Sequence, residues 1–180
     1  MKNSLSILIS ALFIVLMISC KKDPPEAILP EEVEFGESVV YLNGKAADYL
    51  PVFNHDTINY LLNFSFVETK NQSQLVNSLN FDWLPLHEGK YKLITDRTPR
   101  VNALTSFSQT VSEDLEGYEY KLMDANEGYF NIEHLDTISM EVKGRFKVKF
   151  CRTKKNGTKD GDLPKNMVIQ GVFYEKYTFR

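Results

Sequence analysis

The stretch "MEVKGRFKVKF", residues 140–150, decides the fold class because its side chains alternate between two kinds. One face carries the apolar side chains of Met140, Val142, Phe146, Val148 and Phe150. The other face begins with Glu141 and continues with the basic side chains of Lys143, Arg145, Lys147 and Lys149. A period of two residues is typical of a β-strand that has one face in a core and the other in water. We therefore predict a half-buried antiparallel strand here.

The same alternation recurs along most of the chain after residue 38. The clearest further runs lie at residues 60–66, 75–83, 118–122 and 167–179. Turn signals such as Asn43-Gly44 and the "HEGK" of residues 87–90 separate these runs. No stretch outside the N-terminal apolar run has a convincing helical period. Eight to ten antiparallel strands predict a β-sandwich, with a lipocalin-like β-barrel as the alternative that periodicity does not separate from it.

An apolar run at residues 5–18 follows a short basic start at Lys2. As a helix it would be about 21 Å long, which is less than the ~30 Å hydrocarbon core of a bilayer. It therefore predicts the apolar part of an export signal, and a short membrane anchor is the alternative.

The run ends in Leu16, Met17, Ile18, Ser19 and Cys20, a sequence that resembles a bacterial lipobox. The resemblance implies cleavage after Ser19 and attachment of lipid to Cys20, which would bind the protein to a membrane. Several acyl chains anchor firmly, because each buried methylene contributes about 0.8 kcal/mol. Cys151 is then the one remaining thiol, so no internal disulfide is expected.

These features divide the chain into three parts. Residues 1–19 form the predicted lipoprotein signal peptide, and residues 20–34, rich in charge and proline, form a tether. Residues 35–180 form one β-domain, which is long enough to bury a single core.

Two late segments share an aliphatic-x-Gly-x-Phe pattern. The first is Val142, Gly144 and Phe146, and the second is Ile169, Gly171 and Phe173. Together with "YLNG" at residues 41–44 and "LPLHEGKYKL" at residues 84–93, this pattern resembles uncharacterised surface lipoproteins of Bacteroidota. The resemblance implies an all-β fold and a place at the outer membrane or cell surface. It implies no catalytic residue.

Few residues suggest enzyme chemistry. The formal net charge of −3 gives no support for nucleic-acid binding. His134 and Asp136 would share a strand face, which can begin a metal site, but no third ligand lies nearby in the sequence. We therefore expect no cofactor and no metal, and whether the protein is an enzyme is left open.

The row formed by Lys143, Arg145, Lys147 and Lys149 is the leading candidate for ligand binding. Such a row could attract an acidic glycan or a phosphate-rich surface. The alternative is a solvated face that resists edge-to-edge aggregation. Trp83 is a second candidate, because aromatic rings anchor ligands, although its register matches that of Phe81 and favours the core.

Asp56-Thr57-Ile58 and Asp136-Thr137-Ile138 both resemble the three-residue O-glycosylation signal of Bacteroidota. The resemblance implies Thr57 and Thr137 as glycan acceptors. The alternative is an ordinary Asp-Thr pair that begins a strand.

These observations together predict a surface-anchored lipoprotein whose non-enzymatic β-domain binds an extracellular ligand, which would be a glycan, a protein or an envelope component. The alternatives are a small glycan-active hydrolase and a structural or immunity subunit of an envelope assembly. The expected partners are the membrane, through the lipid, and that ligand.

Overall fold

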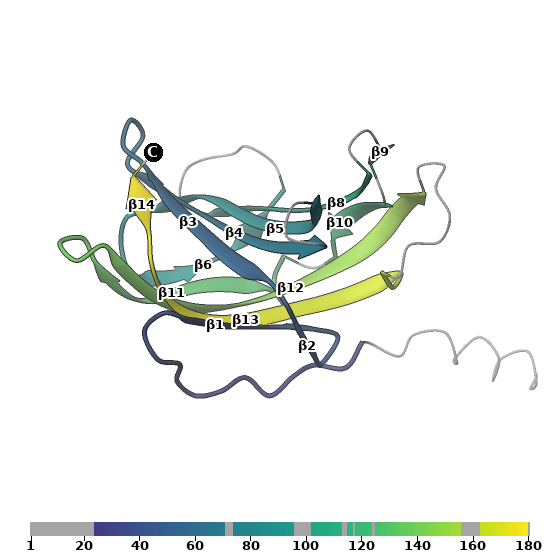
Figure 1. Cartoon of the computed structure of the whole chain (residues 1–180), viewed down its shortest axis with the longest axis horizontal. Coiled ribbons are helices and arrows are strands. Elements are labelled where there is room, and N and C mark those ends of the chain that lie inside the picture. The colour runs from purple at the N-terminus through teal and green to yellow at the C-terminus, as the bar shows by residue number, and fades with distance from the viewer. Residues whose placement is uncertain are drawn as a thin grey trace, which may run out of the picture.

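The computed structural model shows two β-sheets packed face to face (Figure 1). It describes residues 24–70, 74–95, 102–112, 115–116, 118–123, 125–155 and 163–179. These residues form fourteen strands, of which eight have six or more residues. The predicted β-sandwich is confirmed, because the sheets remain two separate layers and do not close into a barrel.

The first sheet has the strand order β2-β1-β13-β12-β11-β6, with β10 also paired to β12. Its strands are β1 (Glu37–Leu42), β2 (Lys45–Ala47), β6 (Gly89–Tyr91), β10 (Tyr118–Leu122), β11 (Tyr129–Asp136), β12 (Glu141–Lys155) and β13 (Asn166–Lys176). The second sheet has the order β14-β3-β4-β5-β8-β7, with β9 paired to β8. Its strands are β3 (Leu50–Asp56), β4 (Leu61–Lys70), β5 (Gln74–Pro85), β7 (Leu93–Ile94), β8 (Ala103–Ser112), β9 (Leu115–Glu116) and β14 (Thr178–Phe179).

The core between the sheets is rich in phenylalanine. Rings from the first sheet meet rings from the second, as in the pairs Phe66–Phe146 and Phe81–Phe130, whose centroids are each 4.6 Å apart. The predicted inward face of β12 is confirmed, because Val142, Phe146, Val148 and Phe150 are all buried. Aromatic pairs at such distances add to the free energy gained by burying their area.

The repeated aliphatic-x-Gly-x-Phe pattern has a structural reason. The antiparallel register of β12 and β13 sets Gly144 opposite Phe173 and Phe146 opposite Gly171. A Cβ atom on Gly144 would lie 2.8 Å from Cζ of Phe173, and one on Gly171 would lie 2.6 Å from Cε1 of Phe146. Each ring therefore occupies the space that a side chain on the opposite residue would need. The pairing of β11 with β12 shifts register next to Gly144, between Ile132 and His134 of β11.

The predicted register fails at the end of β5. Phe81 pairs with Phe64 and Leu84 pairs with Leu62, so that Asp82 and Trp83 together face the single residue between them on β4. This β-bulge breaks the alternation, and Trp83 does not share the buried face of Phe81. Trp83 is half-buried and has a φ of 66°.

The two Asp-Thr-Ile segments form the turns of two hairpins, residues 57–60 between β3 and β4 and residues 137–140 between β11 and β12. In each turn the aspartate Oδ1 accepts hydrogen bonds from two backbone N–H groups: Ile58 (2.9 Å) and Asn59 (3.1 Å) donate to Asp56, and Ile138 (2.7 Å) and Ser139 (3.1 Å) donate to Asp136. The backbone bonds are the main cause that lowers the pKa of Asp136, whereas the pKa of Asp56 is lowered first by a hydrogen bond from the side chain of Asn59 to Oδ2 and then by the backbone bonds. The repeat therefore builds a turn and does not begin a strand.

Candidate functional site

The basic row lies on the outer face of the first sheet, along β12. Its four side chains, those of Lys143, Arg145, Lys147 and Lys149, are only 13–28% exposed. This exposure is low for lysine and arginine on an outer face, so other parts of the chain must cover the row.

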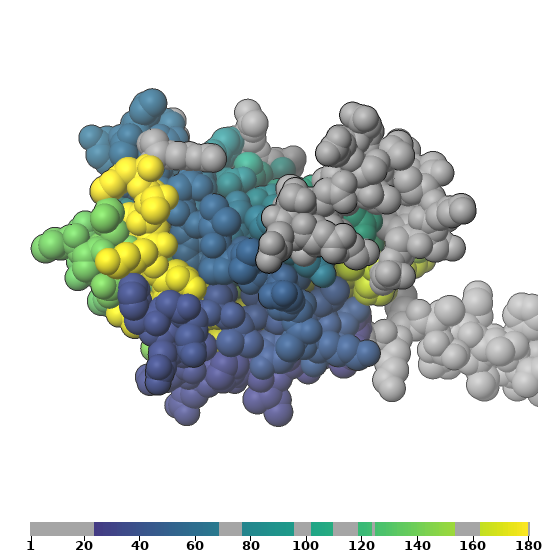
Figure 2. All heavy atoms as spheres, in the orientation of Figure 1, coloured from purple at the N-terminus to yellow at the C-terminus, as the bar shows by residue number. Residues whose placement is uncertain are grey.

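Residues 24–34 provide this cover, and we call them the strap. They have almost no regular secondary structure and run beneath β1 and β13 in Figure 1, where they appear in purple. The purple atoms of Figure 2 gather along the same side of the molecule. The strap is therefore a layer of extended chain outside the first sheet.

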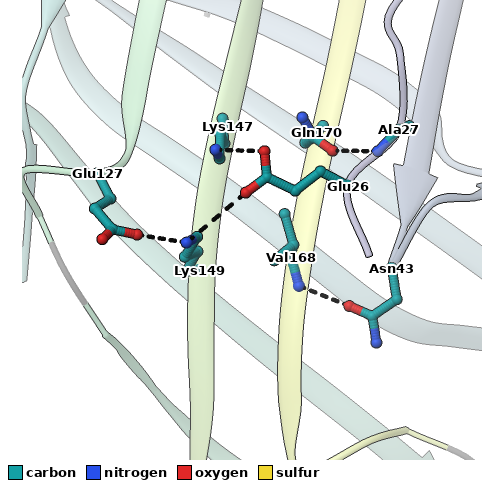
Figure 3. A network of polar contacts seen from close by, with 8 residues as sticks. All are labelled: Glu26, Ala27, Asn43, Glu127, Lys147, Lys149, Val168 and Gln170. Atoms are coloured by element: carbon teal, nitrogen blue, oxygen red, sulfur yellow. Dashed lines mark hydrogen bonds and ion pairs between the residues drawn. The ribbon is translucent and has the colours of Figure 1, made fainter. Parts of the chain in front are cut away.

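Glu26 of the strap makes the strongest contact with the row. Lys147 Nζ donates a hydrogen bond to Glu26 Oε2 at 2.6 Å, and Lys149 Nζ lies 3.8 Å from Glu26 Oε1 (Figure 3). Lys149 also pairs with Glu127, from the turn before β11. The hydrogen bond from Lys147 is the main cause that lowers the pKa of the Glu26 carboxyl, although partial burial opposes it.

The other two members of the row also have acidic or carbonyl partners. Arg145 pairs with Glu133 of β11, and its Nη2 donates to the backbone oxygen of Glu31 at 3.1 Å. Lys143 Nζ lies 3.8 Å from Glu32 Oε1. The sequence predicted an open basic face, and this is wrong, because residues distant in the sequence bring one carboxylate or more to each cation.

Backbone contacts hold the strap as well. The N–H of Ala27 donates to Gln170 Oε1 at 2.8 Å, and Gln170 itself is buried (Figure 3). Pro25 lies against Gly44 in the turn between β1 and β2. Beside it, Asn43 Oδ1 accepts a hydrogen bond of 2.7 Å from the Val168 N–H. The described part of the predicted tether is thus packed on the domain.

The outer face of the second sheet has a different chemistry. Amide and hydroxyl side chains from four adjacent strands meet there, and we call them the amide–hydroxyl face: Asn54, Asn63, Ser65, Asn80 and Ser106. Asn80 is at the centre. Its Oδ1 accepts from Ser65 Oγ at 2.9 Å, and its Nδ2 donates to Ser106 Oγ at 3.4 Å.

Asp82 lies on β5 at the border of this face. Its carboxyl is half-buried, and burial raises its pKa. No residue in the described part of the chain makes a hydrogen bond or an ion pair with this carboxyl. The backbone N–H of the next residue, Trp83, donates to Asn63 Oδ1 at 3.1 Å, which places the bulge beside the amide–hydroxyl face.

The remaining sequence candidates do not come together. His134 is exposed and lies 3.6 Å from Glu88, and no group of three potential metal ligands occurs among the described residues. Thr57 and Thr137 are exposed in their turns, and their glycosylation stays a prediction. Cys20 lies outside the described residues.

Within the described ranges, no helix is long and apolar enough to span a membrane. Comparison with protein-family models, with curated proteins and with solved structures gave no match.

The sequence missed the amide–hydroxyl face. Its members come from β3, β4, β5 and β8, and each lies at a polar position of an alternating strand. Alternation marks such positions as outward, but strand order is needed to show that they are neighbours.

Proposed function

We propose that the protein is a lipid-anchored lipoprotein of the outer membrane or cell surface whose β-sandwich binds an extracellular ligand without chemical change. The lipobox-like sequence ending in Cys20 supports the anchor. The position of the strap supports a defined orientation of the domain.

The position of the strap carries this proposal. Only three residues, 21–23, separate Cys20, the predicted lipid site, from the first described residue, Pro24. The four residue steps from Cys20 to Pro24 span at most about 14 Å when extended. Because the strap lies outside the first sheet, the anchor reaches the domain from that side. The amide–hydroxyl face belongs to the other sheet and would be turned away from the membrane.

The same arrangement favours the second sheet as the ligand surface. An acidic ligand on the basic row would have to displace Glu26, whose contact with Lys147 is already made within the chain. A ligand on the amide–hydroxyl face would not have to displace any described residue of another part of the chain.

Metabolic labelling with an alkyne fatty acid tests the anchor. The chain has two cysteines, which provide a matched pair of variants, Cys20→Ser and Cys151→Ser. We expect label on the wild type and on Cys151→Ser, and none on Cys20→Ser. Equal labelling of the two variants, or no label on the wild type, would contradict the proposal.

The orientation has its own test on intact cells. In the Cys151→Ser background, Ser106→Cys places a thiol on the second sheet and Glu32→Cys places one on the strap. A bulky maleimide that does not enter membranes should react faster with the first. Equal rates after correction for the rates in detergent would contradict an outward-facing second sheet.

A further inference from the structure

We propose that the amide–hydroxyl face is a binding site for a neutral saccharide and that Asp82 is its charged hydrogen-bond acceptor. This inference rests on the proposed function, because it names the class of the extracellular ligand and the residues that contact it.

The amide–hydroxyl face can both donate and accept hydrogen bonds. An amide group both donates and accepts, and a hydroxyl group does the same, which matches the neighbouring hydroxyls of a sugar. Asn80 Oδ1 accepts from both Ser65 Oγ and Ser78 Oγ at 2.9 Å, and Asn63 Nδ2 donates to Asn54 Oδ1 at 3.5 Å. These contacts, one within β5 and the others between neighbouring strands, hold the side chains in place, which lowers the entropy lost on binding.

The carboxylate of Asp82 is half-buried at the border of this face. A half-buried charge without a partner is unfavourable, and burial raises the pKa of this group accordingly. The second sheet therefore contains an acceptor whose hydrogen bonds no described residue supplies. Two hydroxyls of one sugar ring could supply them. The negative charge also selects against an acidic glycan or a phosphate, because like charges repel.

The backbone next to this carboxylate is irregular, because the β-bulge of β5 lies there. Trp83 has a φ of 66°, a conformation that is unfavourable for a residue with a bulky side chain. Such strain and β-bulges occur often at binding sites, where a bulge changes the direction of a side chain.

A neutral saccharide fits this face better than a protein partner. Protein interfaces concentrate apolar residues at their centre. Here the centre is Asn80, and the exposed apolar side chains on the strands of the same sheet, Leu50, Val52 and Phe179, lie on its two outermost strands, β3 and β14, with Val52 opposite Ser65.

The test uses the full-length protein purified in detergent, with immobilised glucan, mannan, galactan and xylan as neutral probes and polygalacturonate and chondroitin sulfate as acidic ones. We expect at least one neutral polysaccharide to bind and neither acidic one. Asp82→Asn and Ser106→Ala should each weaken that binding, Asp82→Asn by roughly tenfold, because a hydrogen bond to a charged group is lost. Lys143→Gln, on the opposite sheet, should leave it unchanged.

Two outcomes would overturn the inference: no binding to any of the four neutral polysaccharides, or neutral binding that Asp82→Asn and Ser106→Ala leave intact. Thermal unfolding of each variant excludes misfolding as the cause of a loss, and Asp82→Asn keeps the shape of the side chain. Fatty-acid labelling at Cys20 is measured on the same material. A labelled protein that binds no neutral polysaccharide would reject the saccharide and keep the lipid-anchored lipoprotein.

Discussion

The two sheets of the sandwich share one kind of inner face and differ in their outer faces. Both turn phenylalanine rings inward, and these rings form one core. On the outside, the first sheet carries the basic row, and the strap covers it. The second sheet carries uncharged amides and hydroxyls, and at their border lies the carboxylate of Asp82, which has no partner in the described part of the chain. The shared core therefore explains why the two sheets pack together. The outer faces differ in their polar side chains and in whether the strap covers them.

This difference shows that a row of charges is weak evidence for a ligand site. Glu26 and Lys147 are 121 residues apart in the sequence, yet they form the closest ion pair between the strap and the row. Opposite charges within one chain can form ion pairs with each other. A row of basic side chains can therefore fix another segment of the same chain on a sheet rather than bind a ligand. The amide–hydroxyl face is less conspicuous in the sequence, yet it borders the carboxylate of Asp82, to which none of the described residues donates a hydrogen bond.

The largest expected effect concerns the core of the first sheet. Gly144→Ala would place a Cβ against the backbone oxygen of Asn131 and 2.8 Å from Cζ of Phe173. Because the backbone oxygen cannot easily move, we expect the free energy of unfolding to fall by about 3 kcal/mol. Urea denaturation measures this change. Ser106→Ala on the second sheet should stay within about 0.5 kcal/mol of the wild type. Similar losses in the two variants would show that the glycine–phenylalanine packing is wrong.

A smaller loss should follow when the basic row is reversed. Lys147→Glu combined with Lys149→Glu would place like charges beside Glu26 and Glu127. We expect about 2 kcal/mol of lost stability and faster hydrogen exchange at the Ala27 amide as the strap detaches. The control combines Lys45→Glu with Lys92→Glu, which gives the same change of charge at exposed sites. If the control loses as much, net charge and not the strap explains the effect.

Glu26 alone should have a weaker effect that depends on pH. Its pKa is lowered in the folded state, mainly by Lys147, so its contribution is present above the ordinary carboxyl pKa of 4.5 and is lost as the pH falls through the lower folded value. Glu26→Gln should cost about 0.5 kcal/mol at neutral pH, and this cost should become smaller as the pH falls below 4.5 towards 3. Glu34→Gln is the matched control. Urea midpoints of both variants at the two pH values decide the point, and a loss for Glu26→Gln that is equally large in acid would refute the ion pair.

The smallest effect should have the opposite sign and lie on the second sheet. Burial raises the pKa of Asp82, so the ionised carboxylate destabilises the folded state at any pH above that raised value. Asp82→Asn should therefore raise stability by about 0.5 kcal/mol at neutral pH, and the gain should shrink in acid. Asp48→Asn, at an exposed site, should change nothing. Thermal unfolding at several pH values measures both. A loss of stability in Asp82→Asn would mean that the carboxylate has a structural partner.

Much of the architecture could be predicted from local patterns. Alternation at residues 140–150 gave the correct inner face of β12, and Asn43-Gly44 gave the two-residue turn between β1 and β2, where both residues have positive φ. The prediction failed at Trp83, because a bulge inserts one residue and no local signal marks it. It failed again at the basic row, because the partners Glu26, Glu31 and Glu32 come from the N-terminal end of the described chain, far from β12 in the sequence.

The sequence by itself determined the fold class, the inward side chains of the long strands and the lipobox-like segment at Cys20, because each depends on residues close together in the chain. Only the tertiary structure decided that the strap covers the basic row, that Gly144 lies opposite Phe173, and that amides and hydroxyls from four strands form one face. The physical reason is that periodicity fixes the direction of a side chain, whereas strand order and register fix its neighbours.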